Sequence, residues 1–319
     1  MSFSLFSTYL LSLNSGEFSM NLLFYTGVVL IWGTTWFAIL FQLGNVDPLV
    51  SVIYRFALAS AILMAWCLGT GKNMRYPLKD HLFMVLLGFF LFSLNYWLFY
   101  VAELYLASGL VAVVFSTMVI WNILFGSIFI GTPIRSRVVF GGVLGLTGIT
   151  MVFWPELSSF ELSDAGMLGL LLSLGATVSA SVGNITSARN QMEGIPVIQA
   201  NAWGMSYGTV LMMAAAVLTG KEFTFQATVP YVVSLAYLAL FGSVFAFGMY
   251  LTLIGRIGAD RAAYTTLLFP MVALALSMAF EGYRGSGGAM VGIGLILVGN
   301  WIVLKKVPGI QYPVPGKTS

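Results

Sequence analysis

The feature of this sequence that most constrains its fold is a series of long apolar runs with very few charged residues in them. A helix needs about 20 apolar residues to cross a bilayer, whereas a barrel strand needs only about 10 residues of alternating polarity. The runs here are continuous, which indicates helices, whose backbone hydrogen bonds are satisfied within each segment. Only 8% of the residues are charged, against about 25% in soluble domains. The chain is therefore predicted to be an all-α integral membrane protein.

Polar residues divide the apolar runs into ten predicted transmembrane helices. Lys and Arg accumulate in cytoplasmic loops, and most of the 14 Lys and Arg residues fall on one side if the N-terminus is inside. An even number of spans then returns the C-terminus to the same side, so both termini are predicted to be cytoplasmic. The spans are expected near residues 21–41, 48–69, 81–104, 108–131, 137–154, 165–189, 196–219, 231–254, 260–281 and 286–305.

An acidic loop at 155–164 separates two halves of five predicted helices each. Five is an odd number, so the second half must enter the membrane in the opposite orientation. Moving the chain along itself until Gly141 meets Gly292 also aligns Gly131 with Gly282 and Gly148 with Gly299. The sequence therefore predicts two inverted repeats and a tail at each end. The repeats are expected at 21–154 and 165–305, an N-terminal tail at 1–20, and a disordered C-terminal tail at 306–319.

Three motifs carry a resemblance to a known family, namely IWGTTW (31–36), RFALA (55–59) and EGYRGSGGAMVGIGLILVG (281–299). With them the chain resembles the drug/metabolite transporter superfamily in its ten-helix form with two EamA domains. More narrowly it is similar to bacterial amino-acid exporters, including aromatic amino-acid exporters of the YddG type. The resemblance implies a multi-pass carrier of the cell inner membrane that works by alternating access.

The first half departs from the family pattern at one place. Its segment GTPIRSR (131–137) lacks the acidic residue that Glu281 supplies in the second half. The role of Glu281 is therefore not expected to be duplicated by the repeat.

Composition excludes several other function classes. With one cysteine, Cys67, and one histidine, His81, the chain can form no intrachain disulfide, Cys/His zinc site or Cys–His nucleophile pair. No clustered nucleophiles or paired carboxylates occur at membrane depth, so no enzymatic activity, metal or cofactor is expected. No long basic tract points to nucleic acid, and no charged ring points to a channel. The expected partners are a small-molecule substrate and the lipid bilayer, and no oligomer is required.

Polar and aromatic residues deep in the predicted spans are candidates to line a cavity between the halves. Ser and Thr have the alternative role of joining membrane helices, and Trp near a span end commonly belongs to the interfacial belt. Aromatic walls with a few amides suit amphipathic zwitterions, so amino acids, including aromatic and neutral ones, are the expected cargo. The alternative is an exporter of drugs or nucleosides with proton antiport. The candidates are Trp32, Thr34, Asn95, Phe99, Met118, Trp121, Asn122, Ser181, Asn184, Tyr264 and Thr265.

One charged residue, Arg55, lies within a predicted span, about 10 Å below the outer boundary. An ionisable group at that depth usually faces the bundle interior and pairs. Glu103 is the expected partner and Asp47 the second choice. The pair is either a fixed brace or an outer gate. Alternatively, Arg55 attracts the carboxylate of a substrate or extends to the interface.

Carboxylates are missing from the predicted membrane midplane. Glu103 and Glu281 fall near the outer ends of their spans, and His81 near an inner end. Proton-driven carriers usually hold such a group within the membrane. Gradient-driven export is therefore expected rather than obligatory proton exchange.

Two further features concern the scaffold. Pro270 removes a backbone hydrogen bond from the ninth predicted helix, which makes it the candidate hinge. The spacings Gly141-x-x-x-Gly145 and Gly288-x-x-x-Gly292 allow close approach of helix backbones. Packing within the molecule is the expected use of these glycines, with a dimer face as the alternative.

Overall fold

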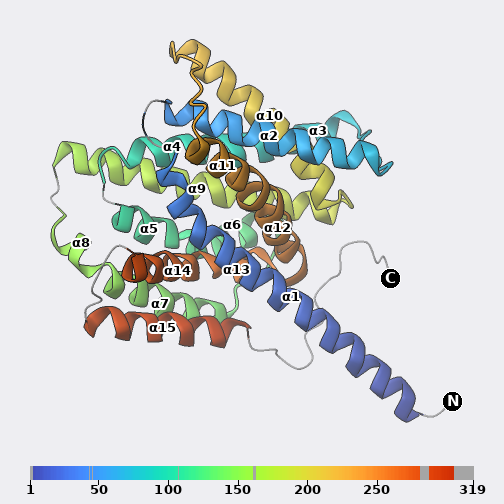
Figure 1. Cartoon of the computed structure of the whole chain (residues 1–319). Coiled ribbons are helices and arrows are strands. Elements are labelled where there is room, and N and C mark those ends of the chain that lie inside the picture. The colour runs from blue at the N-terminus through green and yellow to red at the C-terminus, as the bar shows by residue number, and fades with distance from the viewer. Residues whose placement is uncertain are drawn as a thin grey trace.

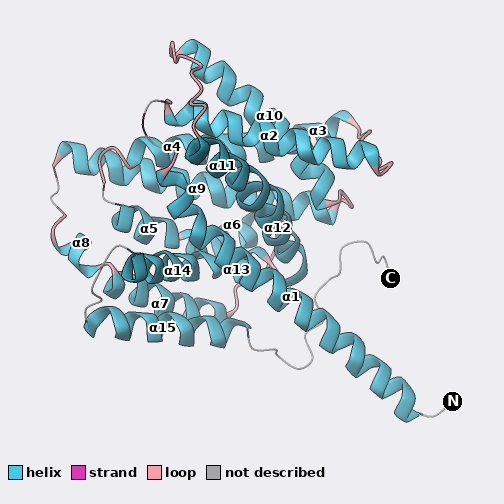
Figure 2. Ribbon diagram, viewed as in Figure 1, coloured by secondary structure: helices cyan, strands magenta, loops and turns pink. Residues whose placement is uncertain are grey.

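The computed structural model describes residues 3–42, 44, 46–106, 108–160, 163–280 and 287–304, and these residues form an all-helical bundle (Figures 1 and 2). Two π-helical segments, η1 (Phe90–Leu94) and η2 (Leu238–Phe245), each join two α-helices into one longer rod. The α-helices are α1 (Phe3–Leu40), α2 (Pro48–Gly69), α3 (Leu78–Phe89), α4 (Asn95–Ala102), α5 (Ser108–Ser116), α6 (Met118–Ile130), α7 (Ser136–Val152), α8 (Trp154–Ser158), α9 (Asp164–Met192), α10 (Val197–Leu218), α11 (Val229–Tyr237), α12 (Ala246–Ile257), α13 (Ala259–Ala262), α14 (Thr265–Phe280) and α15 (Gly287–Leu304).

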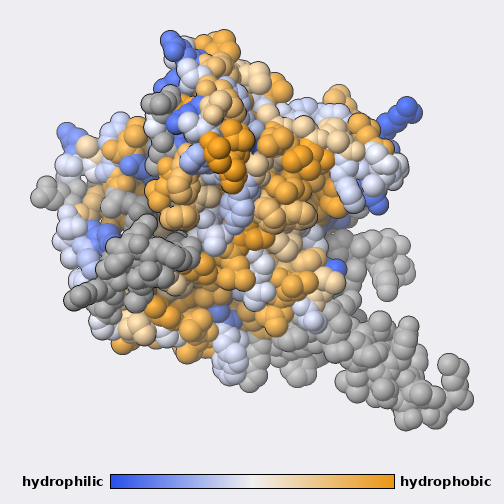
Figure 3. Space-filling view, viewed as in Figure 1, coloured by the Kyte–Doolittle hydropathy of each residue, from blue (hydrophilic) through white to orange (hydrophobic). Residues whose placement is uncertain are grey.

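Seven helical segments of the described chain are long and apolar enough to cross a membrane. At the three other predicted spans lie α7, α10 and α14. Apolar side chains gather on the outside of the bundle, as lipid contact requires (Figure 3). The seven segments are Ser19–Leu40, Pro48–Gly69, Leu78–Ala102, Gly109–Ile130, Asp164–Met192, Val229–Ile257 and Gly287–Leu304.

The two tails of the sequence analysis differ in outcome. Helix α1 begins at Phe3, so most of the expected N-terminal tail is helical and continuous with the first span. In Figure 1 this part of α1 extends away from the other helices. The expected disorder of 306–319 lies outside the described residues, as does Glu281.

Helices from the two halves pack in pairs that are preserved when the halves are exchanged. The second rod of each half is α2 or α10, and these two pack together. The fifth rods, α7 and α15, also pack together and lie side by side in Figure 1. Helix α1 packs on α14, while its counterpart α9 packs on α5 and α6. This pattern indicates that the halves are structural repeats.

Glycines at the interface of α7 and α15 support the register of the repeat. A Cβ atom on Gly141 would lie 2.9 Å from the carbonyl oxygen of Gly299, and one on Gly148 would lie 2.5 Å from that of Gly292. The register that aligns Gly141 with Gly292 also aligns Gly148 with Gly299, so these two contacts are copies of each other. The prediction that Gly141 and Gly292 serve close packing within the molecule is confirmed.

The π-helical segments η1 and η2 occupy corresponding places in the third rod of each half. In the register of the repeat, η1 corresponds to residues 241–245, which lie inside η2. Within η2, the Ser243 hydroxyl donates to the carbonyl of Leu238, five residues earlier, at 3.1 Å. Single π-helical turns interrupt the regular α-helical ladder and are frequent at functional sites. Segment η1 contributes Leu91 to the lining of the cavity described below, and segment η2 binds the lining residues Trp32 and Arg55.

Candidate functional site

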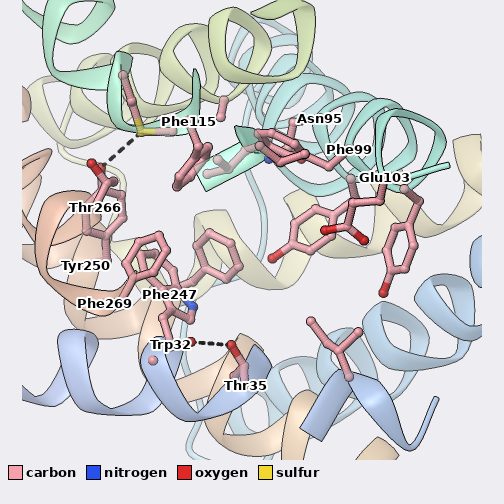
Figure 4. A pocket seen from close by; sticks show the side chains of 18 of the residues that line it. Trp32, Thr35, Asn95, Phe99, Glu103, Phe115, Phe247, Tyr250, Thr266 and Phe269 are labelled. Atoms are coloured by element: carbon pink, nitrogen blue, oxygen red, sulfur yellow. Dashed lines mark hydrogen bonds between the residues drawn. The ribbon is translucent and has the colours of Figure 1, made fainter. Parts of the chain in front are cut away.

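A cavity of about 510 Å³ lies between the two halves, within the range of about 300–1,000 Å³ that is usual for small-molecule sites. Its walls come from both repeats. In Figure 4, Asn95, Phe99 and Glu103 on and just beyond α4 face the same space as Trp32 and Tyr250. Rings dominate the lining, and the aromatic lining residues are Trp32, Phe37, Tyr96, Phe99, Tyr100, Phe115, Phe247, Tyr250 and Phe269.

Trp32 is the centre of the aromatic wall. Its ring centroid lies 5.0 Å from that of Tyr250 and 5.1 Å from that of Phe247. Its Nε1 donates to the carbonyl of Gly242 in η2 at 3.1 Å. On another part of the wall, Phe99 packs edge-on against Phe115 at 5.1 Å. Rings fixed in this way offer flat apolar faces against which an aromatic or aliphatic group of a solute can be desolvated.

The cavity extends from the middle of the helices toward one end of the bundle. Among its lining residues, Leu40 ends α1, and Glu103 and Leu106 follow the end of α4. No described residue of α1 before Trp32 lines the cavity. A solute therefore has a path toward the end where α1 and α4 finish.

Polar contacts between the halves close the opposite end. The Asn122 amide on α6 donates to the carbonyl of Ala259 at 3.0 Å. Nη1 of Arg135, at the start of α7, lies 3.6 Å from Oδ2 of the buried Asp260 on α13. The Tyr264 hydroxyl donates to the carbonyl of Val138. We refer to Asn122, Arg135, Ala259 and Asp260 as the closed end.

Amides form the floor of the cavity above the closed end. The Asn184 amide nitrogen donates to the Tyr250 hydroxyl at 3.1 Å, and it lies 3.4 Å from Oδ1 of Asn122. That oxygen also accepts from the Ser181 hydroxyl at 2.6 Å. The side-chain oxygens of Asn184 and Asn95, both buried, have no hydrogen-bond donor within the described structure. Both oxygens are enclosed and lack a donor, and they belong to side chains that line the cavity.

Arg55 faces the bundle interior, as predicted, and is only 4% exposed. Its Nε donates to the Ser243 hydroxyl at 2.8 Å, and its Nη2 donates to the carbonyl of Gly242 at 3.2 Å. Its Cζ lies 5.3 Å from the centre of the Tyr96 ring and 5.5 Å from that of Phe56. The irregular backbone of η2 thus holds the guanidinium with neutral groups.

The expected ion pair between Arg55 and Glu103 is wrong. Both line the cavity, but the structure forms no ion pair between them among the described residues. Arg55 lies against Tyr96, and Glu103 lies seven residues further along α4, which is about 10 Å along a helix axis at about 1.5 Å per residue. The second expected partner, Asp47, instead lies 2.7 Å from Lys221.

The cavity brings together seven of the predicted site residues. They are Trp32, Arg55, Asn95, Phe99, Glu103, Met118 and Asn184. Their position in the cavity wall is observed in the structure, and their part in transport remains a prediction.

Six predicted cavity residues are not in its lining, and most of these have other partners. Asn122 and Ser181 lie below the floor, and Tyr264 belongs near the closed end. The Thr34 hydroxyl lies 2.6 Å from that of Tyr237, and the Thr265 hydroxyl donates to the carbonyl of Ala262, the last residue of α13. Trp121 packs on Phe125, with ring centres 5.7 Å apart. Pro270 is buried within α14, next to the lining residue Phe269, and its hinge role remains a prediction.

Several lining aromatics were missed by the sequence analysis. Tyr96 and Tyr100 adjoin the predicted Asn95 and Phe99, so the neighbouring positions on the same helix were an available signal. Other missed residues lie either in the predicted span 231–254, for which no cavity residue was predicted, or in spans for which other residues were chosen. They are Phe115, Phe247, Tyr250 and Phe269.

Two structural repeats around a cavity that extends toward one end define a membrane carrier for small solutes. Residues 19–154 and 167–305 match the model of the EamA-like transporter family, one match for each half. The chain belongs to this family. It is therefore a multi-pass membrane transporter and not an enzyme.

Individual relatives match most of this chain. YedA of Escherichia coli strain K12, described as an uncharacterized inner membrane transporter, is 29% identical over 270 residues, which are 84% of this chain and 85% of YedA. A probable amino-acid metabolite efflux pump of the same strain is 25% identical over 285 residues, covering 86% and 91% of the two chains. PagO of Salmonella typhimurium is 24% identical over 288 residues, covering 90% and 93%. One crystal structure shares the fold, with a TM-score of 0.71 and 19% identity over 89% of this chain and 96% of the other.

Proposed function

We propose that this protein is a secondary carrier that exports small amphipathic metabolites, chiefly neutral and aromatic amino acids, across the inner membrane by alternating access. The observation that carries the proposal is the cavity, whose aromatic walls hold one guanidinium, one carboxylate and two amides with free oxygens. Apolar walls match the side chain of such a substrate, and the few polar groups match its charged atoms. The similarity to a probable amino-acid metabolite efflux pump and the resemblance to YddG-type exporters support this substrate class.

Alternating access requires a second state in which the closed end opens and the cavity mouth shuts. With both termini in the cytoplasm and ten spans, the present cavity extends toward the outside. The rods that carry η1 and η2 border the cavity in both repeats, so they are suited to move as equivalent elements. No carboxylate lies on the described floor of the cavity, which favours gradient-driven export over proton antiport.

Phe99 tests the role of the aromatic wall. We expect Phe99→Ala to raise the KM for uptake of labelled phenylalanine into proteoliposomes about tenfold, because one edge-on ring contact and part of the apolar wall are lost. Phe129→Ala is the matched control, since Phe129 is 65% exposed on the outside of α6. Equal effects of the two changes on transport would remove Phe99 from the site. Uptake of nucleosides in preference to every amino acid would reject the proposed substrate class.

Cysteine labelling tests the proposed orientation. In a Cys67→Ala background, we expect a cysteine at exposed Asn73 to react with an impermeant thiol reagent only after cells are opened. A cysteine at exposed Ser159 is expected to react on intact spheroplasts. Ser159 lies in the acidic loop 155–164, which is outside when the positively charged loops stay inside. The buried Cys67 of the unmodified protein provides the unreactive control. Reaction of both sites from one side would contradict the proposed topology.

A further inference from the structure

Arg55 is a buried cation beside a cavity, and nothing in the described structure neutralises its charge. Its partners are a hydroxyl, a carbonyl and two rings. No ion pair joins it to Glu103 or to any other described carboxylate. A buried charge is costly unless an opposite charge approaches it. Since Arg55 lines the cavity, an anionic group of a solute can supply that charge.

Asn95 carries a hydrogen-bond acceptor that has no donor. Its side chain is 6% exposed, lines the same cavity, and its Oδ1 has no donor among the described residues. An amide oxygen left buried without a donor costs about 1–3 kcal/mol. Asn95 precedes Tyr96, whose ring lies 5.3 Å from Cζ of Arg55. The guanidinium of Arg55 and the amide of Asn95 are therefore at the same level of the cavity.

We propose that Arg55 binds the carboxylate of an α-amino acid while Oδ1 of Asn95 accepts a hydrogen bond from its ammonium group. This inference rests on the proposed transport of amino acids and identifies how that cavity recognises them. The two groups of the substrate are joined to one carbon, which suits binding partners at one level. The side chain then lies against the aromatic wall around Trp32. Glu103, about 10 Å further toward the mouth, lies outside this pair of contacts.

The test compares phenylalanine with two analogues that each lack one charge. Phenylalanine methyl ester has no carboxylate, and 3-phenylpropionate has no ammonium group. We expect wild-type protein in detergent to bind phenylalanine at least tenfold more tightly than either analogue, since a hydrogen bond to a charged group contributes about 1.5–3 kcal/mol. Calorimetry on the wild type alone therefore tests the proposal even if a variant fails to fold.

Two variants assign the charges to residues. Arg55→Gln is expected to weaken the binding of phenylalanine and of 3-phenylpropionate at least tenfold and to leave the binding of the methyl ester unchanged. Asn95→Leu is expected to weaken the binding of phenylalanine and of the ester about fivefold and to leave the binding of 3-phenylpropionate unchanged. Arg256→Gln, the same substitution at an exposed position outside the cavity, is the control for Arg55.

Three outcomes separate the possible failures. If Arg55→Gln weakens all three compounds equally, Arg55 only braces α2 against η2 and the inference is wrong. If the wild type binds phenylalanine and its ester equally well, the carboxylate site is wrong although amino-acid transport stands. If the wild type binds none of the amino acids but does bind a nucleoside, the proposed function itself fails.

Discussion

Gly292→Val is expected to abolish the folded protein in detergent, whereas Gly294→Val is expected to leave its yield and melting temperature nearly unchanged. A Cβ atom at Gly292 would lie 2.5 Å from the carbonyl oxygen of Gly148. Backbone cannot rotate away as a side chain can, so α7 and α15 would have to separate. Overpacking of a well-packed interface costs about 1–3 kcal/mol, and more where no side chain can move. Size-exclusion chromatography and thermal unfolding report the loss.

The two glycines form a matched pair because they lie on the same helix and receive the same side chain. A Cβ atom at Gly294 would meet nothing within 4 Å. The β-branched valine therefore has a similar local effect on α15 in both variants. If both variants fold equally well, the close approach of α7 and α15 is not a requirement of the fold.

The second large effect concerns the ion pair of the closed end. Arg135→Gln is expected to lower the free energy of unfolding by about 3 kcal/mol, because the buried Asp260 carboxylate loses one of its two neighbouring guanidinium groups and keeps only that of Arg261. The side chain of Asp260 is 5% exposed and that of Arg135 is 22% exposed. Asp260→Asn should therefore cost less, since the guanidinium of Arg135 can reach water. Thermal unfolding of the purified variants gives the comparison.

The double variant Arg135→Gln, Asp260→Asn completes this cycle. It should be close in stability to Asp260→Asn alone, because no buried carboxylate remains. Losses that simply add would show that the two side chains do not stabilise each other. The ion pair between Arg189 on α9 and Asp80 on α3, also at 3.6 Å, provides a second cycle.

The sequence was informative about the scaffold because its signals are local and repeated. Apolar runs and the aligned glycines were enough to predict helices, two halves and close backbone packing within the molecule at Gly141 and Gly292. Membrane helices need a continuous apolar length, and close helix crossings need small residues. Both requirements appear directly in the order of residues.

The partner of Arg55 was predicted wrongly although its depth could have been compared with that of Glu103. Arg55 lies seven residues inside α2, whereas Glu103 follows the last residue of α4. At about 1.5 Å per residue these positions differ by about 10 Å in height. Glu103 was chosen for its opposite charge and its place near the outer end of its predicted span. The actual partners lie in η2, and π-helical segments have no reliable sequence signature.

Errors in the cavity lining have a related cause. Phe247 and Tyr250 follow η2, which changes the direction in which later side chains of the rod point. Trp121 follows the break between α5 and α6, and Tyr264 lies in the break between α13 and α14. A prediction that assumes an unbroken helix with 3.6 residues per turn assigns the wrong face after each interruption.

Counterflow in proteoliposomes tests the carrier account most directly. Vesicles loaded with unlabelled phenylalanine are diluted into a trace of labelled phenylalanine. The control is vesicles that carry the protein in their membrane but no phenylalanine inside. A carrier that exposes one cavity alternately to each side should accumulate label transiently above its equilibrium level, without a proton gradient and only in the loaded vesicles. Entry of label at the same rate and to the same level in loaded and empty vesicles would contradict alternating access.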